Sequence, residues 1–340
     1  MYLNIEHIIL LAGRLFIILL LIFLSSCNSD PDAFQTLRTG SSFENHLQNR
    51  TLRVLCTEDQ LHLTLQLIKE FQKIHTGILT EISLYEWSTP IEKLSLGKDD
   101  LVLVSDAQSL KIPEQYWRMK YARDGMVGII NKSNPFCNEI LEFGLDTQQL
   151  THILTGDKSM SWSKVLGSEQ NSPIKVFISS DEFLMGKLWA DFLRIEPNDF
   201  MGIMTASVQD MIDSIRREPL SIGFCCQRYA YDPLTRKEIA EIKVVPLDCN
   251  SNGILEDKEK FYDDLDLLQR AMWLGKYPCH SFLDYYIVAK EKPKNKLHID
   301  FMKWILTEGQ KELHTAGFIL LRTRLINTEI EELNRLLAST

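Results

Sequence analysis

Short strand-like runs that alternate with helical stripes constrain the fold of this chain more than any other feature. Thr51–Cys56 (TLRVLC) has the composition of a strand, and Leu61–His75 follows with apolar residues at helical spacing. Ile78–Leu84 and Asp100–Val104 (DLVLV) have the strand pattern again. Strands separated by helices form βαβ units, in which the strands lie parallel. The sequence therefore predicts an α/β fold with mixed, mostly parallel sheets flanked by helices.

The alternation continues towards the C-terminus. We expect the chain to turn through Tyr121–Gly125 into a strand at Met126–Asn131, which ends before Pro135. The further strands are expected at Lys175–Ile178, Ser221–Cys225, Ile242–Pro246 and Tyr285–Ala289. The further helices are expected at Gln148–Thr155, Glu182–Leu193, Val208–Arg217, Glu256–Trp273, Leu297–Glu308 and Thr328–Ala338.

The N-terminal residues have the pattern of a targeting segment. Ten unbroken apolar residues (Leu15–Leu24) follow Arg14, and Ser25-Ser26-Cys27 follows at once. Ten helical residues rise about 15 Å, half of a hydrocarbon core, which is typical of a signal peptide and too short for a membrane span. The ending resembles a bacterial lipobox, in which the thiol of Cys27 is diacylated. The alternatives are a plain signal peptide and a retained anchor that starts near Ile8.

This interpretation divides the chain into a targeting segment, a tether and two lobes. Residues 1–26 are the predicted lipoprotein signal peptide and 27–49 a polar tether that leads away from the membrane. The net charge is −9, and one Arg and one Glu leave with the signal, so the mature charge stays 36 − 45 = −9. An acidic chain without long basic runs excludes a nucleic-acid binder, because phosphate neutralisation needs clustered Lys and Arg. The expected location is the bacterial cell envelope, in the periplasm or at the cell surface.

The six cysteines other than Cys27 match no CxxC metal motif. We expect most of them to be small buried apolar residues, with a Cys249–Cys279 disulfide as the alternative for that pair. The six residues are Cys56, Cys137, Cys225, Cys226, Cys249 and Cys279.

Five segments in this order and spacing resemble the phosphate-binding proteins of ABC importers, the PstS-like group. They are ARDGMVGIINKSNP (122–135), LTHILTGDKSMSW (150–162), SIGFCCQRYAY (221–231), YPCHSFLDYYIVAK (277–290) and ILTEGQKELHTAGFILL (305–321). The resemblance implies the type II periplasmic-binding fold, in which two α/β lobes close on a ligand. Carried over, lobe 1 is 50–124 plus 280–340, and lobe 2 is 125–279.

An anion between such lobes is held by helix N-termini, hydroxyls and usually one Arg. Thr57 follows the first strand, where it either donates to a ligand or only caps the next helix. Ser105 and Asp106 follow the DLVLV strand and match the Ser-Asp of the family, which implies contact with a protonated oxyanion. An ordinary Asx turn is the alternative for this pair.

The third loop departs from the family, which has Arg followed by Ser-Gly-Thr at this place. Here the chain reads Phe177-Ile178-Ser179-Ser180-Asp181-Glu182-Phe183. Ser179 and Ser180 are candidate ligand residues, but Ser179 and Glu182 also match a capping box. Arg123 is the candidate substitute for the missing guanidinium.

The segment Asp248–Glu259 satisfies the calcium-loop pattern D-x-[DN]-x-[DN]-G-x5-E. It predicts a structural Ca²⁺ site, because the side chains at positions 1, 3, 5 and 12 and the carbonyl at position 7 are oxygen donors. Glu256, at position 9, would bind directly or through water. The alternative is an Asx-rich turn that caps the next helix. The expected ligands are Asp248, Asn250, Asn252, Ile254, Glu256 and Glu259.

No H-E-x-x-H, G-x-S-x-G or G-x-x-x-x-G-K motif is present, so we expect no enzyme. The sequence predicts an extracytoplasmic solute-binding lipoprotein that binds a small oxyanion such as phosphate. Its expected partners are an ABC permease and, through the lipid anchor alone, the membrane. The alternative is a diverged lipoprotein that has lost phosphate binding and has a structural or interaction role.

Overall fold

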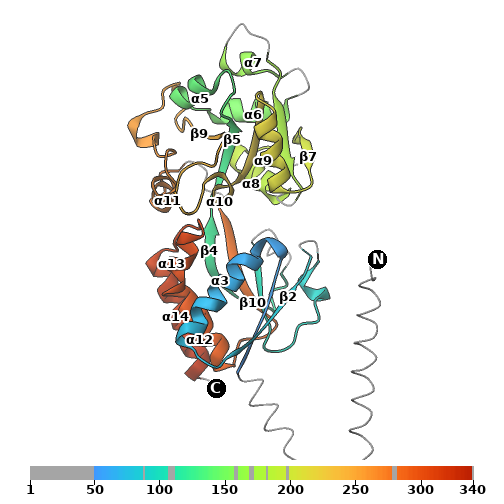
Figure 1. The fold of residues 1–340 in the computed structure, drawn as a ribbon, viewed down its shortest axis with the longest axis vertical. Coiled ribbons are helices and arrows are strands. Elements are labelled where there is room, and N and C mark those ends of the chain that lie inside the picture. The colour runs from blue at the N-terminus through green and yellow to red at the C-terminus, as the bar shows by residue number, and fades with distance from the viewer. Residues whose placement is uncertain are drawn as a thin grey trace, which may run out of the picture. The chain divides into compact units, whose positions relative to one another are not determined.

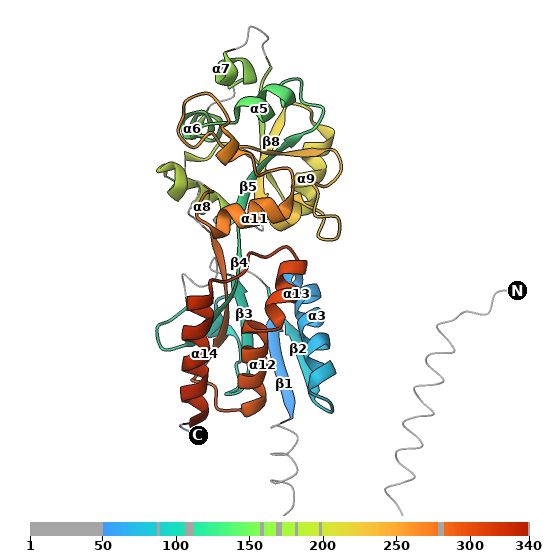
Figure 2. The ribbon, with the colours of Figure 1, turned by 90° about the vertical axis from the view of Figure 1, so that its left-hand side faces the viewer.

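The computed structural model describes residues 50–86, 89–105, 112–156, 160–167, 172–180, 183–196, 199–277 and 282–338. These residues contain two five-stranded sheets flanked by helices, as Figures 1 and 2 show, and the predicted fold class is confirmed. The predicted signal peptide, Cys27 and the tether lie outside the described residues, as do Asp106, Asp181, Glu182 and Cys279. Within the ranges given above, no helix is both long and apolar enough to cross a membrane.

The first sheet, sheet A, has the strand order β2-β1-β3-β10-β4. Strand β1 is parallel to β2 and β3, while β10 is antiparallel to β3 and β4, so β4 runs in the same direction as β1. The bounds are Thr51–Cys56 (β1), Leu79–Leu84 (β2), Leu101–Ser105 (β3), Trp117–Asp124 (β4) and Leu283–Ala289 (β10).

Helix α3 (Glu58–Ile74) packs on β1 through Leu67, Ile68 and Phe71, which lie at helical spacing and are buried. Phe71 contacts the rings of Phe301 and Trp304 at centroid distances of 5.1 and 5.8 Å. The C-terminal helices of this lobe are α12 (Lys296–Leu306), α13 (Gly309–Thr315) and α14 (Thr323–Ala338), and a 3-10 turn, η2 (Ile91–Lys93), follows β2. We call sheet A and these helices lobe 1.

The second sheet, sheet B, has the strand order β7-β6-β8-β5-β9. Strand β6 is parallel to β7 and β8, whereas β5 is antiparallel to β8 and β9. The bounds are Met126–Asn131 (β5), Lys175–Ser179 (β6), Ile203–Thr205 (β7), Ser221–Cys226 (β8) and Ile242–Val245 (β9).

Helices α8 (Phe183–Leu193) and α9 (Val208–Arg217) pack on β6 and β8. Helix α9 begins at a Ser207 cap and buries Val208, Met211, Ile212 and Ile215. The other helical elements are α5 (Cys137–Phe143), α6 (Thr147–Thr155), α7 (Trp162–Leu166), α10 (Gln227–Ala230), η4 (Asp257–Glu259) and α11 (Leu265–Trp273). We call sheet B and these helices lobe 2.

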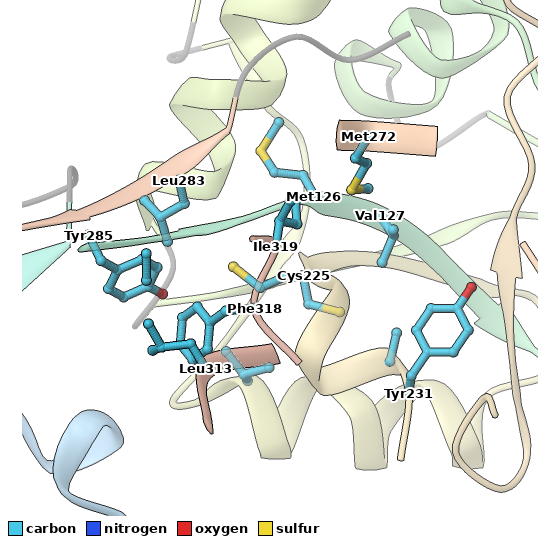
Figure 3. Packing of buried hydrophobic residues seen from close by; sticks show 14 of the residues in the cluster. Met126, Val127, Cys225, Tyr231, Met272, Leu283, Tyr285, Leu313, Phe318 and Ile319 are labelled. Atoms are coloured by element: carbon cyan, nitrogen blue, oxygen red, sulfur yellow. The ribbon is translucent and has the colours of Figure 1, made fainter. Parts of the chain in front are cut away.

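Strands β4 and β5 are separated by one residue, Gly125, and form the crossing between the lobes. The prediction of a turn at Tyr121–Gly125 is wrong, because these residues continue an extended strand. A Cβ built on Gly125 would lie 2.2 Å from the sulfur of Met272, so only glycine fits without a shift of that side chain. Figure 3 shows side chains from both lobes packed around the crossing, and they belong to one hydrophobic cluster.

Two further predictions are corrected. The helix expected at Glu256–Trp273 begins only at Leu265, because Asp264 caps it and the preceding Phe261 and Tyr262 rings stack and pack against Tyr277. Cys249 is exposed, whereas the other four described cysteines are buried as expected. The Cys249–Cys279 bridge stays a prediction, because Cys279 lies outside the described residues.

Candidate ligand site at the carboxyl edges of the sheets

In both sheets, the parallel strands end beside the crossing. In sheet A, Thr57 follows β1, Ser105 ends β3 and Asp124 ends β4, so these residues share the carboxyl edge. In sheet B, β6 ends at Ser179, and the end of β8 pairs with Met126 immediately after the crossing. Ligands of α/β proteins bind at such carboxyl edges, where loops and helix N-termini gather.

Thr57 stands before the first residue of α3 and is 2% exposed. Its side chain makes no cap hydrogen bond, and its Oγ1 has no partner among the described residues. The capping interpretation of Thr57 is therefore wrong for its hydroxyl. The N-terminus of a long helix beside a buried hydroxyl without a partner among the described residues suits an anion. The role of Thr57 as a ligand stays a prediction.

The predicted ligand serines are buried or already hydrogen-bonded to the chain. Ser105 is buried opposite Tyr285 of β10, and its neighbour Asp106 lies outside the described residues. Ser179 is buried at the end of β6. The hydroxyl of Ser180 donates to the Ala206 carbonyl at 2.7 Å. Because Glu182 also lies outside the described residues, the predicted capping box stays a prediction.

Arg123 is held inside sheet A. Its Nε lies 2.6 Å from Oδ1 of Asp284, and its Nη2 lies 3.2 Å from Oδ2. Lys120 pairs with the same carboxylate, and the Arg123 guanidinium also lies over the Phe282 ring at 4.8 Å. This guanidinium is therefore committed to a neighbouring strand.

Sequence reasoning missed Arg228, the buried guanidinium beside the crossing. Its Nε lies 3.0 Å from Oδ2 of Asp124, and its Nη2 lies 3.1 Å from the hydroxyl of Tyr285. Oδ2 of Asp59, in the first turn of α3, lies 3.7 Å from Nη2 of Arg228. One signal was available in the sequence: Arg228 lies two residues after the end of the largely apolar run Ser221–Cys226.

Asp124 is fully buried, and burial raises its pKa to about 7, although Arg228 and the Gly125 N–H both favour the charged form. This carboxyl therefore changes charge near neutral pH, which an ordinary Asp does not.

Tyr121, two strand positions from Arg123, is also fully buried, and its hydroxyl has no partner among the described residues. Burial is the largest influence on its pKa and raises it, so the phenol is a neutral donor. Its electrostatic neighbours, Arg228, Tyr85, Asp59 and Cys56, lie around the N-terminus of α3.

The loop Asp248–Glu259 is a separate site. Oδ2 of Asp248 accepts from the N–H of Gly253 at 2.7 Å, and Glu259 accepts from the N–H of Cys249 and of Glu256, both at 3.0 Å. Gly253 has φ +75°, the left-handed turn that the pattern requires. Asp248 and Glu259 are 3% and 2% exposed, and neither forms an ion pair within the described part of the chain.

The remaining predicted Ca²⁺ ligands of this loop form hydrogen bonds with one another. Oδ1 of Asn250 accepts from Asn252 N–H at 3.0 Å, and Oδ1 of Asn252 accepts from Ile254 N–H at 2.9 Å. Glu256 accepts from the Asn250 amide at 2.8 Å. No three His, Cys, Asp or Glu side chains gather as a metal site within the described ranges, so a cation here would need amide and carbonyl oxygens besides the two buried carboxylates.

Comparisons with known proteins agree with this architecture. The phosphate-binding protein PstS of Staphylococcus saprophyticus is 23% identical over 221 residues, which are 64% of this chain and 62% of that protein. PstS of Staphylococcus aureus is 22% identical over 236 residues, 68% of this chain and 64% of that protein. The chain thus spans less than two thirds of these relatives.

Two solved structures show the same fold. A putative phosphate ABC transporter substrate-binding protein with bound phosphate, from Clostridium perfringens, aligns with a TM-score of 0.57 at 16% identity over 80% of this chain and all of that chain. An ABC-type phosphate transport receptor from Vibrio cholerae aligns with a TM-score of 0.55 at 14% identity over 79% of this chain and all of that chain. A family model described as the PBP superfamily domain matches residues 42–308. The chain therefore belongs to the PBP superfamily, and its resemblance to the PstS-like group is confirmed.

Proposed function

We propose that the chain is an extracytoplasmic solute-binding lipoprotein that binds a small oxyanion such as phosphate and delivers it to an ABC permease. The observation that carries this proposal is the buried Thr57 hydroxyl at the N-terminus of α3, on the carboxyl edge of sheet A, which has no hydrogen-bond partner among the residues that the structure describes. The PstS relatives support the ligand class by their names. Closure of the two lobes over the anion would form the complex that a permease recognises.

The test is isothermal titration of the wild-type protein with phosphate and with sulfate, together with the change in Tm. Thr57→Ala should weaken binding about 10-fold or more, because a hydrogen bond to a charged group contributes about 1.5–3 kcal/mol. Its Tm without ligand should fall only by the effect of one lost buried methyl group, since the hydroxyl has no hydrogen-bond partner in the described ranges. Thr151→Ala, which removes an exposed hydroxyl on α6, should bind as the wild type does. No heat and no Tm shift with either anion would reject the proposal and favour the structural or interaction role.

The lipid anchor belongs to the same proposal and has its own test. Cys27 would carry the diacyl group and hold the protein at the bacterial membrane, with 28–49 as the tether. Equal retention of wild type and Cys27→Ala in the membrane fraction would refute the anchor and leave the ligand proposal intact.

We also propose that the loop Asp248–Glu259 binds Ca²⁺ as a structural ion. Asp248 and Glu259 are buried carboxylates that form no ion pair in the described ranges, which is costly unless a cation neutralises them, and the pattern supplies further oxygen donors. The loop lies between β9 and a 3-10 turn rather than between paired helices, so it would stabilise and not signal.

Addition of 1 mM Ca²⁺ should therefore raise the Tm relative to EDTA. If the Kd is near 10 μM, the free energy of unfolding should increase by about 2.7 kcal/mol. Glu259→Gln should abolish the increase, while Glu241→Gln, on the exposed turn before β9, should retain it. An identical Tm in Ca²⁺ and in EDTA for the wild type would remove the calcium proposal.

A further inference from the structure

Arg228 connects four elements at the crossing. It lies on α10 of lobe 2, and its guanidinium contacts Asp124 of β4, Asp59 of α3 and the Tyr285 hydroxyl of β10. The guanidinium also lies over the rings of Tyr229 and Phe318, at 4.6 and 5.1 Å from the ring centroids. Only 11% of the Arg228 side chain is exposed, so water screens its positive charge weakly.

Two buried hydroxyls of lobe 1 lack a hydrogen-bond partner within the described part of the chain. Oγ1 of Thr57 and the phenol oxygen of Tyr121 make no hydrogen bond among the described residues, and both side chains are at least 98% buried. The Tyr121 ring lies 6.3 Å from the ring of Tyr285, whose hydroxyl accepts a hydrogen bond from Arg228. A buried donor without an acceptor costs free energy, so two such donors beside one guanidinium indicate an acceptor that the chain does not supply.

We infer that the guanidinium of Arg228 and the hydroxyls of Thr57 and Tyr121 bind the oxygens of the oxyanion. The cation of the site would thus come from α10 beside the crossing, and not from the loop after β6 or from Arg123. This inference rests on the proposed function and names the residues that perform it.

The carboxylates around Arg228 make this binding dependent on a proton. An incoming anion competes with Asp124 for the guanidinium, and Asp124 cannot move away because it is part of the crossing strand. A proton on Asp124 removes the competition, and its pKa near 7 makes that proton available. The titratable and charged groups that face Asp124 are Arg228 of α10, Cys226 of β8 and Tyr285 of β10. Above pH 7, each bound anion should therefore take up one proton, and affinity should rise as the pH falls.

The test is isothermal titration of the full chain with sulfate and phosphate at pH 6 and pH 8. Sulfate keeps its charge over this range, so a pH dependence with sulfate reports on the protein. Arg228→Lys should bind 10 to 100 times more weakly, because an ammonium cannot replace a bidentate fork. Tyr121→Phe should bind about 10 times more weakly with no loss of Tm, which a purely structural tyrosine would not show. Asp124→Asn should bind sulfate equally at both pH values and more tightly than the wild type at pH 8.

Arg216→Lys, on α9, is the matched control and should bind as the wild type does. If the wild type binds an anion and Arg228→Lys and Tyr121→Phe bind it equally well, the inference is wrong and the proposed function stands. If the wild type binds neither anion at either pH, the proposed function itself fails. A lower Tm of Arg228→Lys with unchanged affinity also counts against the inference.

Discussion

Replacement of Arg228 by Met is expected to lower the free energy of unfolding, and by about 1.4 kcal/mol more at pH 8 than at pH 6. The substitution keeps much of the side-chain volume but leaves Asp124 fully buried without its cation. The lost charge pair is therefore responsible for the part of the effect that depends on pH.

The pH window follows from the pKa of Asp124. In the wild type this pKa is about 7, above its usual value of 3.8, so the contribution to stability is complete below 3.8 and falls until the pH reaches about 7. Without Arg228 the pKa rises further, and stability continues to fall above pH 7 by at most about 1.4 kcal/mol per pH unit. Urea unfolding from pH 5 to pH 9 measures both curves.

The double variant Arg228→Met with Asp124→Asn is the control for this prediction. It contains no carboxyl at position 124, so its stability should vary less with pH than that of the wild type or of Arg228→Met, and should exceed that of the single Met variant at pH 8. Equal destabilisation of Arg228→Met at every pH would contradict the assignment to Asp124.

Replacement of Phe71 by Ala is expected to cost about 3–5 kcal/mol of unfolding free energy. Phe71 is fully buried on α3 and contacts the rings of Phe301 and Trp304, so its removal opens a cavity between α3 and α12. Because α3 carries Thr57 at its start, oxyanion affinity should fall together with stability.

Leu65→Ala on the same helix is the matched control. Leu65 is 49% exposed, so the loss should stay below about 1 kcal/mol. Urea unfolding of both variants compares them directly, and a similar loss for Leu65 and Phe71 would show that α3 does not dock through the face described here.

The fold was predictable because the sequence patterns that indicate its helices and strands lie within short segments. The apolar spacing of Leu61–His75 and the runs around it are properties of short segments, and the structure forms α3, β1 and β3 within three residues of the expected bounds. Strand β4 was missed, because Arg118, Lys120 and Arg123 interrupt its apolar residues with charges. Asp284, which pairs with Lys120 and Arg123, lies on another strand far along the chain.

The site was predictable in part for the same reason. The positions of Thr57 and Ser105 at strand ends were predictable, because the end of a strand can be recognised locally, and their role as ligands stays a prediction. Arg228 was not, since its partners Asp59, Asp124 and Tyr285 come from three elements far apart in the chain. A buried charge is identified by what surrounds it in space, and one sequence does not contain that information.

The position of β10 inside sheet A has a consequence for the order in which the chain folds. Strands β3 and β4 pair only through β10, which is made about 160 residues after β4. Sheet B contains strands from 126 to 245 alone and can pair completely before β10 emerges. During synthesis or export, lobe 2 is therefore able to fold first. Until β10 is available, β1, β2 and β3 form an incomplete sheet, and another chain could pair with its edge.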